Sequence, residues 1–357
     1  MSGLPRSTGA PSGASLGAAD DPAATSAGTR LEIRRDASAL PPGTAACLGA
    51  FDGLHLGHQA LLQRARAVAS RVALVTFEPH PQRVLAPDRA PPLLLDAEQR
   101  ERWVAALGVD LLVLLPFDAA LSQMDAASFV RTQLLEGLRP QAVVVGADFR
   151  FGARRAGDVA LLQSSLAAAN VALHVVAPVP IPGVAAGADK ISSTTIREAL
   201  GRGEVERAAA MLGRPHAALG RVVHGDRRGR TIGVPTANLA VRDAMLPAPG
   251  VYAGWLSAWD AAGLPELAQP VAAVANLGTN PTFAGARALR LEAHALDLDL
   301  GERLYDRELV MWFGTRLRDE QRFDGVAALV QQLHADLAAA RSWLATHAAP
   351  ALPGGTP

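Results

Sequence analysis

The chain has 357 residues, too many for most single hydrophobic cores, so about two domains are expected. Its 34 basic residues balance its 34 acidic residues, which leaves no global positive field to attract nucleic acid or an anionic membrane surface. Cys47 is the only cysteine, which excludes an intramolecular disulfide and a multi-cysteine zinc site, and favours a reducing compartment, the cytoplasm.

Several well-known phosphate-binding motifs are missing because Lys190 is the only lysine. Ile191 follows it, so it does not belong to a Walker A loop, and a protein-kinase strand lysine with its later signatures is absent too. The apolar run 111–115 is bounded by Asp110 and Asp118, and no uncharged run reaches the roughly 18 residues of a membrane span. A chain that handles nucleotides must therefore do so by other means, away from a membrane.

The two ends of the chain differ in composition from the middle. Residues 1–30 are rich in Gly, Ala, Ser, Thr and Pro and have no apolar segment typical of a signal peptide, so we expect a disordered tail, with a transit peptide as the alternative. Between this tail and a short one at 348–357, we expect one domain at 31–203 and another at 204–347.

The first domain alternates short apolar runs with amphipathic stretches such as 97–107. Continuous apolar strands separated by helices are typical of a parallel sheet covered on both faces, so we predict a doubly wound, Rossmann-like α/β domain with its ligands beyond the carboxyl ends of the strands. The predicted strands are 45–49, 72–77, 111–115, 142–146 and 171–176.

After a helical stretch near 194–212, the pattern changes to alternating strands separated by Gly and Pro. This pattern predicts a small antiparallel barrel, closed by one long helix from 324 to about 346. The predicted strands are 220–224, 251–258, 271–276, 289–297 and 308–313, and the apolar face of the helix comprises Val326, Leu329, Val330, Leu333, Leu337 and Leu344.

The first strand leads into a glycine-rich loop and the start of a helix, over 49–58. Glycines let a backbone approach a ligand closely, and a helix N-terminus offers unpaired N–H groups to a phosphate. His55 and His58 lie three residues apart, so they face the same way and can donate to phosphoryl oxygens during attack on an α-phosphorus. A surface pair or two metal ligands are the alternatives. The candidate nucleotide-binding residues of the loop are Gly49, Phe51, Asp52, Gly53 and Gly57.

Two later segments should reach the same edge of the sheet. Asp148 and Arg150 follow the strand 142–146 and could hold a ribose or base and a phosphate, although an ordinary turn would also explain them. At the start of the next helix, Ser193, Thr194 and Arg197 are placed to bind a triphosphate, and a plain helix cap is the alternative.

In the second domain, a glycine-rich stretch precedes Pro235-Thr236-Ala237-Asn238, which we expect to form a rigid turn. Gly229 and Gly233 would let this loop wrap phosphates, and Thr236 could ligate Mg²⁺, while a glycine-rich hairpin is the alternative.

The strand from Leu291 to Asp297 should place Glu292 on the same face as His294 and Leu296, which we expect to be the barrel interior. A carboxylate there needs a partner or a chemical role, whereas solvent exposure of that face is the alternative.

Four motifs of the first domain resemble, in order, the FMN adenylyltransferase half of bacterial bifunctional riboflavin kinase/FAD synthetases. They are G-x-F-D-G-x-H-x-G-H, T-F-x-P-H-P from Thr76 to Pro81, G-x-D-F-x-F-G and I-S-S-T-x-I-R. The resemblance implies that His55 and His58 bind ATP phosphates. Ala50 departs from the Asn that is frequent at its position in the family.

The second domain resembles the riboflavin kinase half of the same family, through G-R-V-V-H-G-D, G-R-T-I-G-x-P-T-A-N-L, N-x-G-x-N-P-T-F and L-E-x-H. The resemblance implies that Thr236 and Asn238 bind Mg²⁺ and ATP phosphates and that Glu292 is the catalytic base. Asp306 replaces the usual glycine of a Leu-Tyr-Gly turn. The candidate flavin-binding residues are Asn276, Thr282 and Phe283, the last an aromatic that could border a planar ring.

The resemblance implies an enzyme that converts riboflavin to FMN and FMN to FAD, with ATP as co-substrate, Mg²⁺ as cofactor and these small molecules as its partners. A class I aminoacyl-tRNA synthetase also has an H-x-G-H loop, but would need a lysine-rich second motif and a basic surface. A non-catalytic flavin sensor is the other alternative. The oligomeric state stays open.

Overall fold

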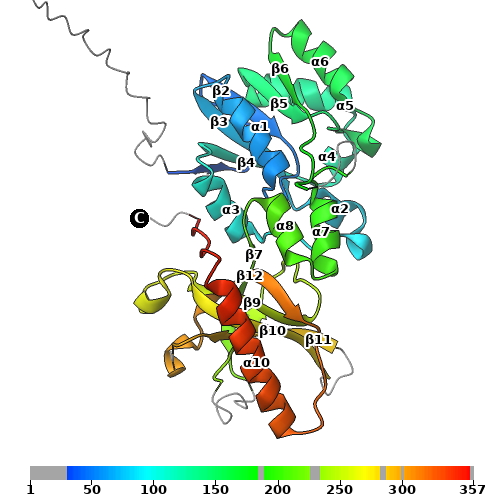
Figure 1. Cartoon of the computed structure of the whole chain (residues 1–357). Coiled ribbons are helices and arrows are strands. Elements are labelled where there is room, and N and C mark those ends of the chain that lie inside the picture. Colours follow the sequence, from blue (N-terminus) through cyan, green and yellow to red (C-terminus); the bar gives the residue numbers. More distant parts are fainter. Residues whose placement is uncertain (1–29, 184–188, 226–233, 282–286, 299–300, 354–357) are drawn as a thin grey trace, which may run out of the picture. The chain divides into compact units, whose positions relative to one another are not determined.

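In the computed structural model of the chain, the structure describes residues 30–183, 189–225, 234–281, 287–298 and 301–353. Apart from Arg30, the expected N-terminal tail lies outside these residues. Leu31–Pro357 form one compact unit, which holds a parallel sheet and a closed barrel (Figure 1).

The first part of this unit is a six-stranded parallel sheet in the order β1-β4-β3-β2-β5-β6. Counted from β2, the order of five strands is 3-2-1-4-5, which is that of a doubly wound nucleotide-binding fold. The fold class predicted from the sequence is therefore confirmed, although β1 was missed. The strands are β1 (Glu32–Arg34), β2 (Thr44–Leu48), β3 (Arg71–Glu78), β4 (Leu111–Pro116), β5 (Ala142–Gly146) and β6 (Ala172–Val176).

Alternate residues of the sheet enter two separate cores, because successive side chains of a strand point to opposite faces. Ala46 packs with α5, α6 and the π-helical segment Val130–Leu138, whereas its neighbour Cys47 packs with α1 and α3. The helices are α1 (Leu56–Arg66), α2 (Pro81–Leu85), α3 (Ala97–Ala106), α4 (Ala119–Gln123), α5 (Ala126–Phe129), α6 (Val159–Ala168), α7 (Ser193–Gly201) and α8 (Val205–Leu212).

The barrel closes in the order β10-β11-β8-β7-β12-β9, and its described neighbours are antiparallel, as predicted. One strand was missed: Ala237 and Asn238 begin β8 instead of completing a turn. Tyr252, Met311 and Phe313 fill the interior in one cluster with residues of α7 and α8, so packing is continuous across the expected boundary near 203. The strands are β7 (His216–Val223), β8 (Ala237–Val241), β9 (Gly250–Ala258), β10 (Val271–Pro281), β11 (Arg287–Ala295) and β12 (Glu308–Arg318).

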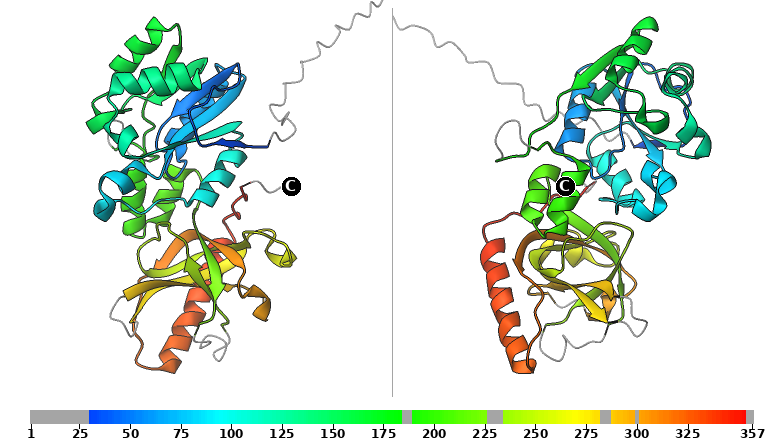
Figure 2. Two further views of the ribbon diagram at one scale, coloured as in Figure 1. Left: turned by 180° about the vertical axis from the view of Figure 1, so that it is seen from behind. Right: turned by 90° about the vertical axis from the view of Figure 1, so that its right-hand side faces the viewer.

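The closing helix α10 (Val326–Leu344) lies along the outside of the barrel (Figure 2). Leu337 and Leu344 pack as predicted against a barrel cluster that includes Val274 of β10, but Val326 is 67% exposed, so its assignment to the packed face was wrong. The predicted apolar face also missed Asp336, which is buried because the Arg318 guanidinium donates to both of its carboxylate oxygens, at 2.7–3.0 Å.

Asp306 occupies a turn position at which the backbone conformation favours glycine. Its φ is +60°, a left-handed conformation that costs most L-residues about 1–2 kcal/mol, and its backbone N–H donates to the Val222 carbonyl at 3.0 Å. The turn itself is thus retained in spite of the substitution.

We expect Asp306→Gly to raise the free energy of unfolding by about 0.5–1 kcal/mol, because relief of backbone strain exceeds the added entropy of an unfolded glycine. The midpoint of thermal unfolding should rise by about 1–2 °C. Asp306→Ala, which keeps the strained Cβ, is the matched control and should not stabilise the protein. Equal stabilisation by both variants would show that the carboxylate, not the backbone, was responsible.

Candidate active sites

The strand order of the sheet reverses between β2 and β5, so the chain leaves these two strands toward opposite sides and opens a crevice at their carboxyl ends. The loop 49–55 follows β2 and the loop 147–152 follows β5. The two segments predicted to bind a nucleotide are therefore neighbours at the place where this fold binds its ligands.

The loop after β2 is held in an unusual conformation by buried side chains. Phe51 and Leu54 have φ values of +50° and +47° and are fully buried. Gly53 has φ +89°, and a Cβ there would lie 2.7 Å from Leu94 Cδ1. Residues in such φ regions persist only where packing fixes them, so the loop is rigid and presents its backbone at a defined place.

The two histidines form a stacked pair at the start of α1. His55 is the N-cap, and its Nδ1 accepts from the backbone N–H of His58 at 3.3 Å. The rings lie 3.6 Å apart at 17° to each other, and a Cβ on Gly57 would come within 3.1 Å of the His55 ring. Because Nδ1 of His55 is an acceptor, the neutral ring carries its proton on Nε2 and can donate from there.

Both histidines are held neutral. Burial, together with the nearby Arg214 guanidinium, lowers the pKa of His55 to about 4, and burial beside His55 lowers the pKa of His58 well below its ordinary value. His58 Nδ1 is buried and has no hydrogen-bond partner among the described residues. The pair therefore offers neutral N–H donors at a helix N-terminus and does not act as a fixed pair of positive charges.

Asp52 joins the loop to the start of α7. One oxygen of its carboxylate accepts from the Leu94 N–H at 2.9 Å and the other pairs with the Arg197 guanidinium. Ser193 Oγ donates to the Asp52 carbonyl at 2.8 Å, and Arg197 Nε donates to the Pro92 carbonyl at 2.8 Å. Burial raises the pKa of Asp52, and Arg197 opposes that rise. The structure thus brings together Asp52, Ser193 and Arg197, which were predicted from separate motifs.

The other predicted residues of this site lie around the same crevice. Thr194 is exposed in the first turn of α7, whereas Ser192 is the residue that caps the helix. Asp148 is paired with Lys190, which holds the pKa of the Asp148 carboxyl below its usual range. Arg150 lies 3.5 Å from Asp158 and remains half exposed.

Three features near this site were missed. Lys190 was noted only as an unusual residue, although its place at the start of the I-S-S-T-x-I-R motif was a signal. Arg214 is packed over the Trp103 ring and donates to the Gly53 carbonyl at 2.8 Å, which no motif indicated. A cavity of about 240 Å³ lies beside Asp52, and residues of the Thr76–Pro81 motif line it. Its lining comprises Ala50, Phe51, Asp52, Phe77, Glu78, Pro79, His80, Arg83, Leu93, Leu95, Asp96, Ala97, Arg100 and Asp243.

In the barrel, register places Asn276 of β10, Glu292 of β11 and Asn238 of β8 side by side across three strands. The prediction that Glu292 faces the barrel interior was wrong. Its neighbours Leu291 and Ala293 are buried in the core. Because successive side chains of a strand alternate, Glu292 points outward, with 29% of its side chain exposed. On this outward face, water reaches the Glu292 carboxylate, and the Arg290 guanidinium lies 3.9 Å from it.

Asn238 has an unsatisfied acceptor beside Glu292. Its Oδ1 is buried without a hydrogen-bond partner among the described residues, and a Cβ on Gly225 would lie 2.1 Å from its amide nitrogen. Thr236 is exposed two residues earlier, and His294 Nδ1 lies 2.7 Å from the Pro235 carbonyl, which fixes the start of β8. An amide oxygen without a partner, in register with a carboxylate and two residues after a hydroxyl, fits a hard cation such as Mg²⁺.

Four predicted residues lie outside the described part of the chain: Gly229, Gly233, Thr282 and Phe283. Asn276, the third flavin-binding candidate, is exposed at the end of the Asn276–Glu292–Asn238 row. His224 and Tyr305, whose rings lie 3.9 Å apart, were not predicted as a pair because they are 81 positions apart in the sequence.

Comparison with known proteins gives two family matches and several full-length relatives. The FAD synthetase model matches residues 37–195 and the riboflavin kinase model matches residues 212–344. A bifunctional riboflavin kinase/FMN adenylyltransferase of Escherichia coli K12 is 38% identical over 84% of this chain and 93% of its own length. A protein of the same name from Pseudomonas fluorescens is also 38% identical, over 86% of this chain and 94% of its own.

Among solved structures, one described as a macrolide-efflux protein from Streptococcus pneumoniae aligns with a TM-score of 0.75 and 30% identity, over 88% of this chain and 99% of that one. The similarity extends over both the sheet and the barrel. Among the helices of the described ranges, none has the length and apolar character that a membrane crossing requires.

The buried histidines predict how stability depends on pH. The pKa of His55 is about 4 in the folded protein and near 6.5 when unfolded, so the unfolded state binds more protons between these values. We expect the free energy of unfolding to fall as pH decreases from about 6.5 to about 4, with this residue contributing a slope of about 1.4 kcal/mol per pH unit.

Urea unfolding at pH 7 and pH 5 measures the effect. His55→Asn keeps a side-chain acceptor at the N-cap but does not titrate in this range, so its stability should depend less steeply on pH by about one proton. A variant with the same slope as the parent would show that His55 is already protonated in the folded protein near pH 5.

Proposed function

The chain belongs to the family of bifunctional riboflavin kinase/FMN adenylyltransferases, enzymes that make FMN from riboflavin and FAD from FMN, and we propose which of its residues carry each reaction. The α/β part, 31–203, adenylylates FMN, and the barrel part, 204–347, phosphorylates riboflavin. The observation that carries the first assignment is the neutral histidine pair at the helix start where the strand order reverses.

In adenylyl transfer, His55 and His58 donate to phosphate oxygens of ATP where negative charge grows during attack on the α-phosphorus. The FMN phosphate that attacks the α-phosphorus and displaces pyrophosphate is already ionised, so the step needs positioning more than a base. Ser193, Thr194 and Arg197 hold the triphosphate at the N-terminus of α7, with Arg197 leaving or sharing Asp52 as ATP binds. Asp148 and Arg150 hold the nucleoside and a phosphate, and Gly49, Phe51, Gly53 and Gly57 shape the loop around them.

The cavity beside Asp52 is the place for FMN. Its lining includes the aromatic and apolar side chains of Phe51, Phe77 and Leu95, which suit a planar ring, and the cations Arg83 and Arg100, which suit an anion. The Phe51 ring lies 5.0 Å from that of His58, so a flavin in the cavity would be next to the phosphate donors. This proximity is what in-line attack requires.

In riboflavin phosphorylation, Glu292 accepts the proton of the ribityl 5′-hydroxyl as that oxygen attacks the γ-phosphorus of ATP and displaces ADP. Thr236 and Asn238 would hold Mg²⁺, which supplies neutralisation of phosphate charge when bound. The backbone of the loop with Gly229 and Gly233 wraps the phosphates. Asn276, Thr282 and Phe283 bind the flavin, with Asn276 next to Glu292 in the strand register.

The cellular setting follows from the same chemistry. We infer a cytoplasmic enzyme whose partners are riboflavin, FMN and ATP, with neither nucleic acid nor a membrane among them, because the chain has balanced charge and a single buried cysteine. Purified protein given riboflavin and MgATP should form FMN and then FAD, separated by chromatography. A flavin sensor that has lost its chemistry would return only riboflavin.

Replacing both His55 and His58 by Ala should stop FAD formation while riboflavin is still converted to FMN, because two donors to the α-phosphate are lost. By analogy with the loss of one oxyanion donor, adenylylation should slow by at least about a hundredfold. Turnover of supplied FMN measures this, with riboflavin phosphorylation as the folding control. FAD formed at the parental rate would remove the histidines from the mechanism.

Glu292→Gln keeps the size of the side chain but cannot accept the proton, so riboflavin phosphorylation should fall by about 10² to 10⁴ at saturating MgATP. Glu292→Asp should recover only part of the rate, because one methylene fewer withdraws the carboxylate by about 1 Å. FMN adenylylation should be intact in both. If the Gln variant phosphorylates riboflavin at a rate within about threefold of the parent, Glu292 is not the base and has only a structural role.

A further inference from the structure

The segment 242–245, which follows β8 of the barrel, reaches the cavity of the α/β part. Asp243 lines that cavity, and its carboxylate lies 2.5 Å from the guanidinium of Arg83, which also lines it from α2. The wall of the proposed FMN site thus contains one residue from the kinase half.

Met245 anchors this segment from both directions. Its backbone N–H donates to the Leu93 carbonyl at 2.7 Å, and its own carbonyl lies 2.6 Å from His216 Nε2 of β7. Burial lowers the pKa of His216 to about 4, so the ring is neutral near pH 7 and donates from Nε2. Leu93 lines the cavity, and the next residue, Leu94, donates to Asp52. One peptide therefore connects a barrel strand to the cavity wall.

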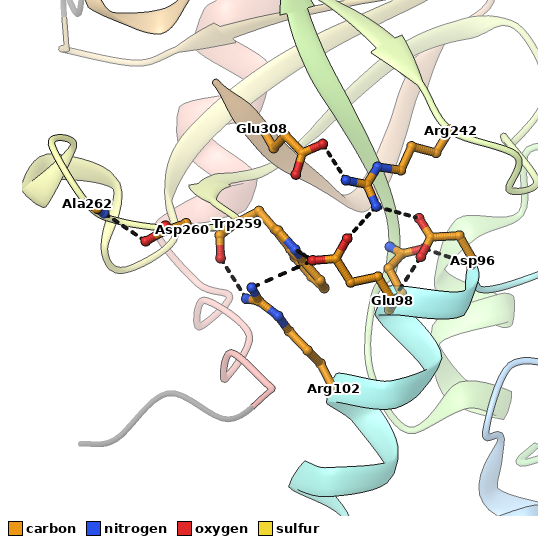
Figure 3. Close-up of polar contacts among 9 residues, drawn as sticks. Asp96, Glu98, Arg102, Arg242, Trp259, Asp260, Ala262 and Glu308 are labelled. Atoms are coloured by element: carbon orange, nitrogen blue, oxygen red, sulfur yellow. Dashed lines mark hydrogen bonds and ion pairs between the residues drawn. The ribbon is translucent and has the colours of Figure 1, made fainter. Parts of the chain in front are cut away.

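Arg242, in the same segment, binds the start of α3 through ion pairs (Figure 3). Its guanidinium lies 2.5 Å from Glu98, pairs with Glu308 of β12 and is 3.9 Å from Asp96, the N-cap of α3. Asp96 and the next residue, Ala97, line the cavity.

Trp259 of the barrel makes further contacts with α3, and we call these contacts, together with those of Arg242, the α3 clamp. Its indole N–H donates to Glu98, and Arg102 of α3 donates to its carbonyl at 2.6 Å while the guanidinium stacks 3.7 Å above its ring (Figure 3). The cavity wall formed by 93–97 is thus held between two groups of contacts with the kinase half.

We propose that the segment 242–245 of the kinase half is a positioning element of the adenylyltransferase site, and that Asp243 orients Arg83 for binding of FMN. The inference rests on the proposed function, which places FMN in this cavity. A purely structural salt bridge would contribute little, because the Asp243 side chain is 69% exposed and such pairs contribute about 0–1 kcal/mol to folding. An effect on FMN binding without an effect on stability therefore separates the two roles.

The test is a charge exchange in the full-length protein. Asp243→Arg and Arg83→Asp should each raise the KM for FMN in adenylylation by about tenfold with little change in kcat, and the double exchange should recover most of the loss. Riboflavin phosphorylation and the melting temperature should stay near parental values. Glu266→Arg, which breaks the exposed pair with Arg303 in the barrel, is the matched control and should leave the KM for FMN unchanged.

A second variant distinguishes failure of this inference from failure of the cavity assignment. Ala50 is exposed and lines the cavity, so Ala50→Trp fills it without disturbing the core, and should also raise the KM for FMN. If Ala50→Trp raises it and Asp243→Arg does not, the positioning role of Asp243 is wrong and the FMN site stands. If neither raises it, FMN binds elsewhere and both assignments fall. Equal losses in the single and double exchange variants would also overturn the pairing.

Discussion

The ion pair between Asp52 and Arg197 holds the proposed adenylyltransferase site together. It joins the loop after β2 to the start of α7, and the same carboxylate fixes the backbone of Leu94. Burial raises the pKa of Asp52, so the carboxylate is costly to keep charged without Arg197, and removal of either partner would leave the other uncompensated. These contacts fix the cavity wall at Leu94 and the N-terminus of α7 to the loop that leads into the histidine pair.

The residues that we propose for the two reactions lie in different electrostatic environments. His55 is buried and His58 partly buried, and their lowered pKa values keep both rings neutral, which suits a step that needs directed donors and no proton acceptor. Glu292 lies on the outer face of the barrel beside the unsatisfied oxygen of Asn238, which suits a carboxylate that must remain available to take a proton. One chain thus separates a step that depends on positioning from one that depends on a base.

The sequence predicted the parts of the structure that depend on local pattern. Apolar runs identified five strands of the sheet. The motifs led us to place Asp52 and Arg197 in one crevice, and the two residues, 145 positions apart in the sequence, are paired there. It could not predict the face of Glu292, because strand alternation gives two sets of residues without saying which set faces inward. Nor could the sequence predict the roles of Asp243, Arg214 or the α3 clamp, because these depend on long-range contacts that no local spacing encodes.

Four cations around the proposed adenylyltransferase site already have carboxylate partners within the protein. Arg197 is paired with Asp52, Lys190 with Asp148, Arg83 with Asp243 and Arg100 with Glu78. Positive and negative side chains are thus paired at the site, as their numbers are equal in the whole chain. An incoming polyphosphate must share or replace these carboxylates, which weakens binding of any anion that lacks the right shape. Charges held in this way favour discrimination between ligands over affinity for phosphate as such.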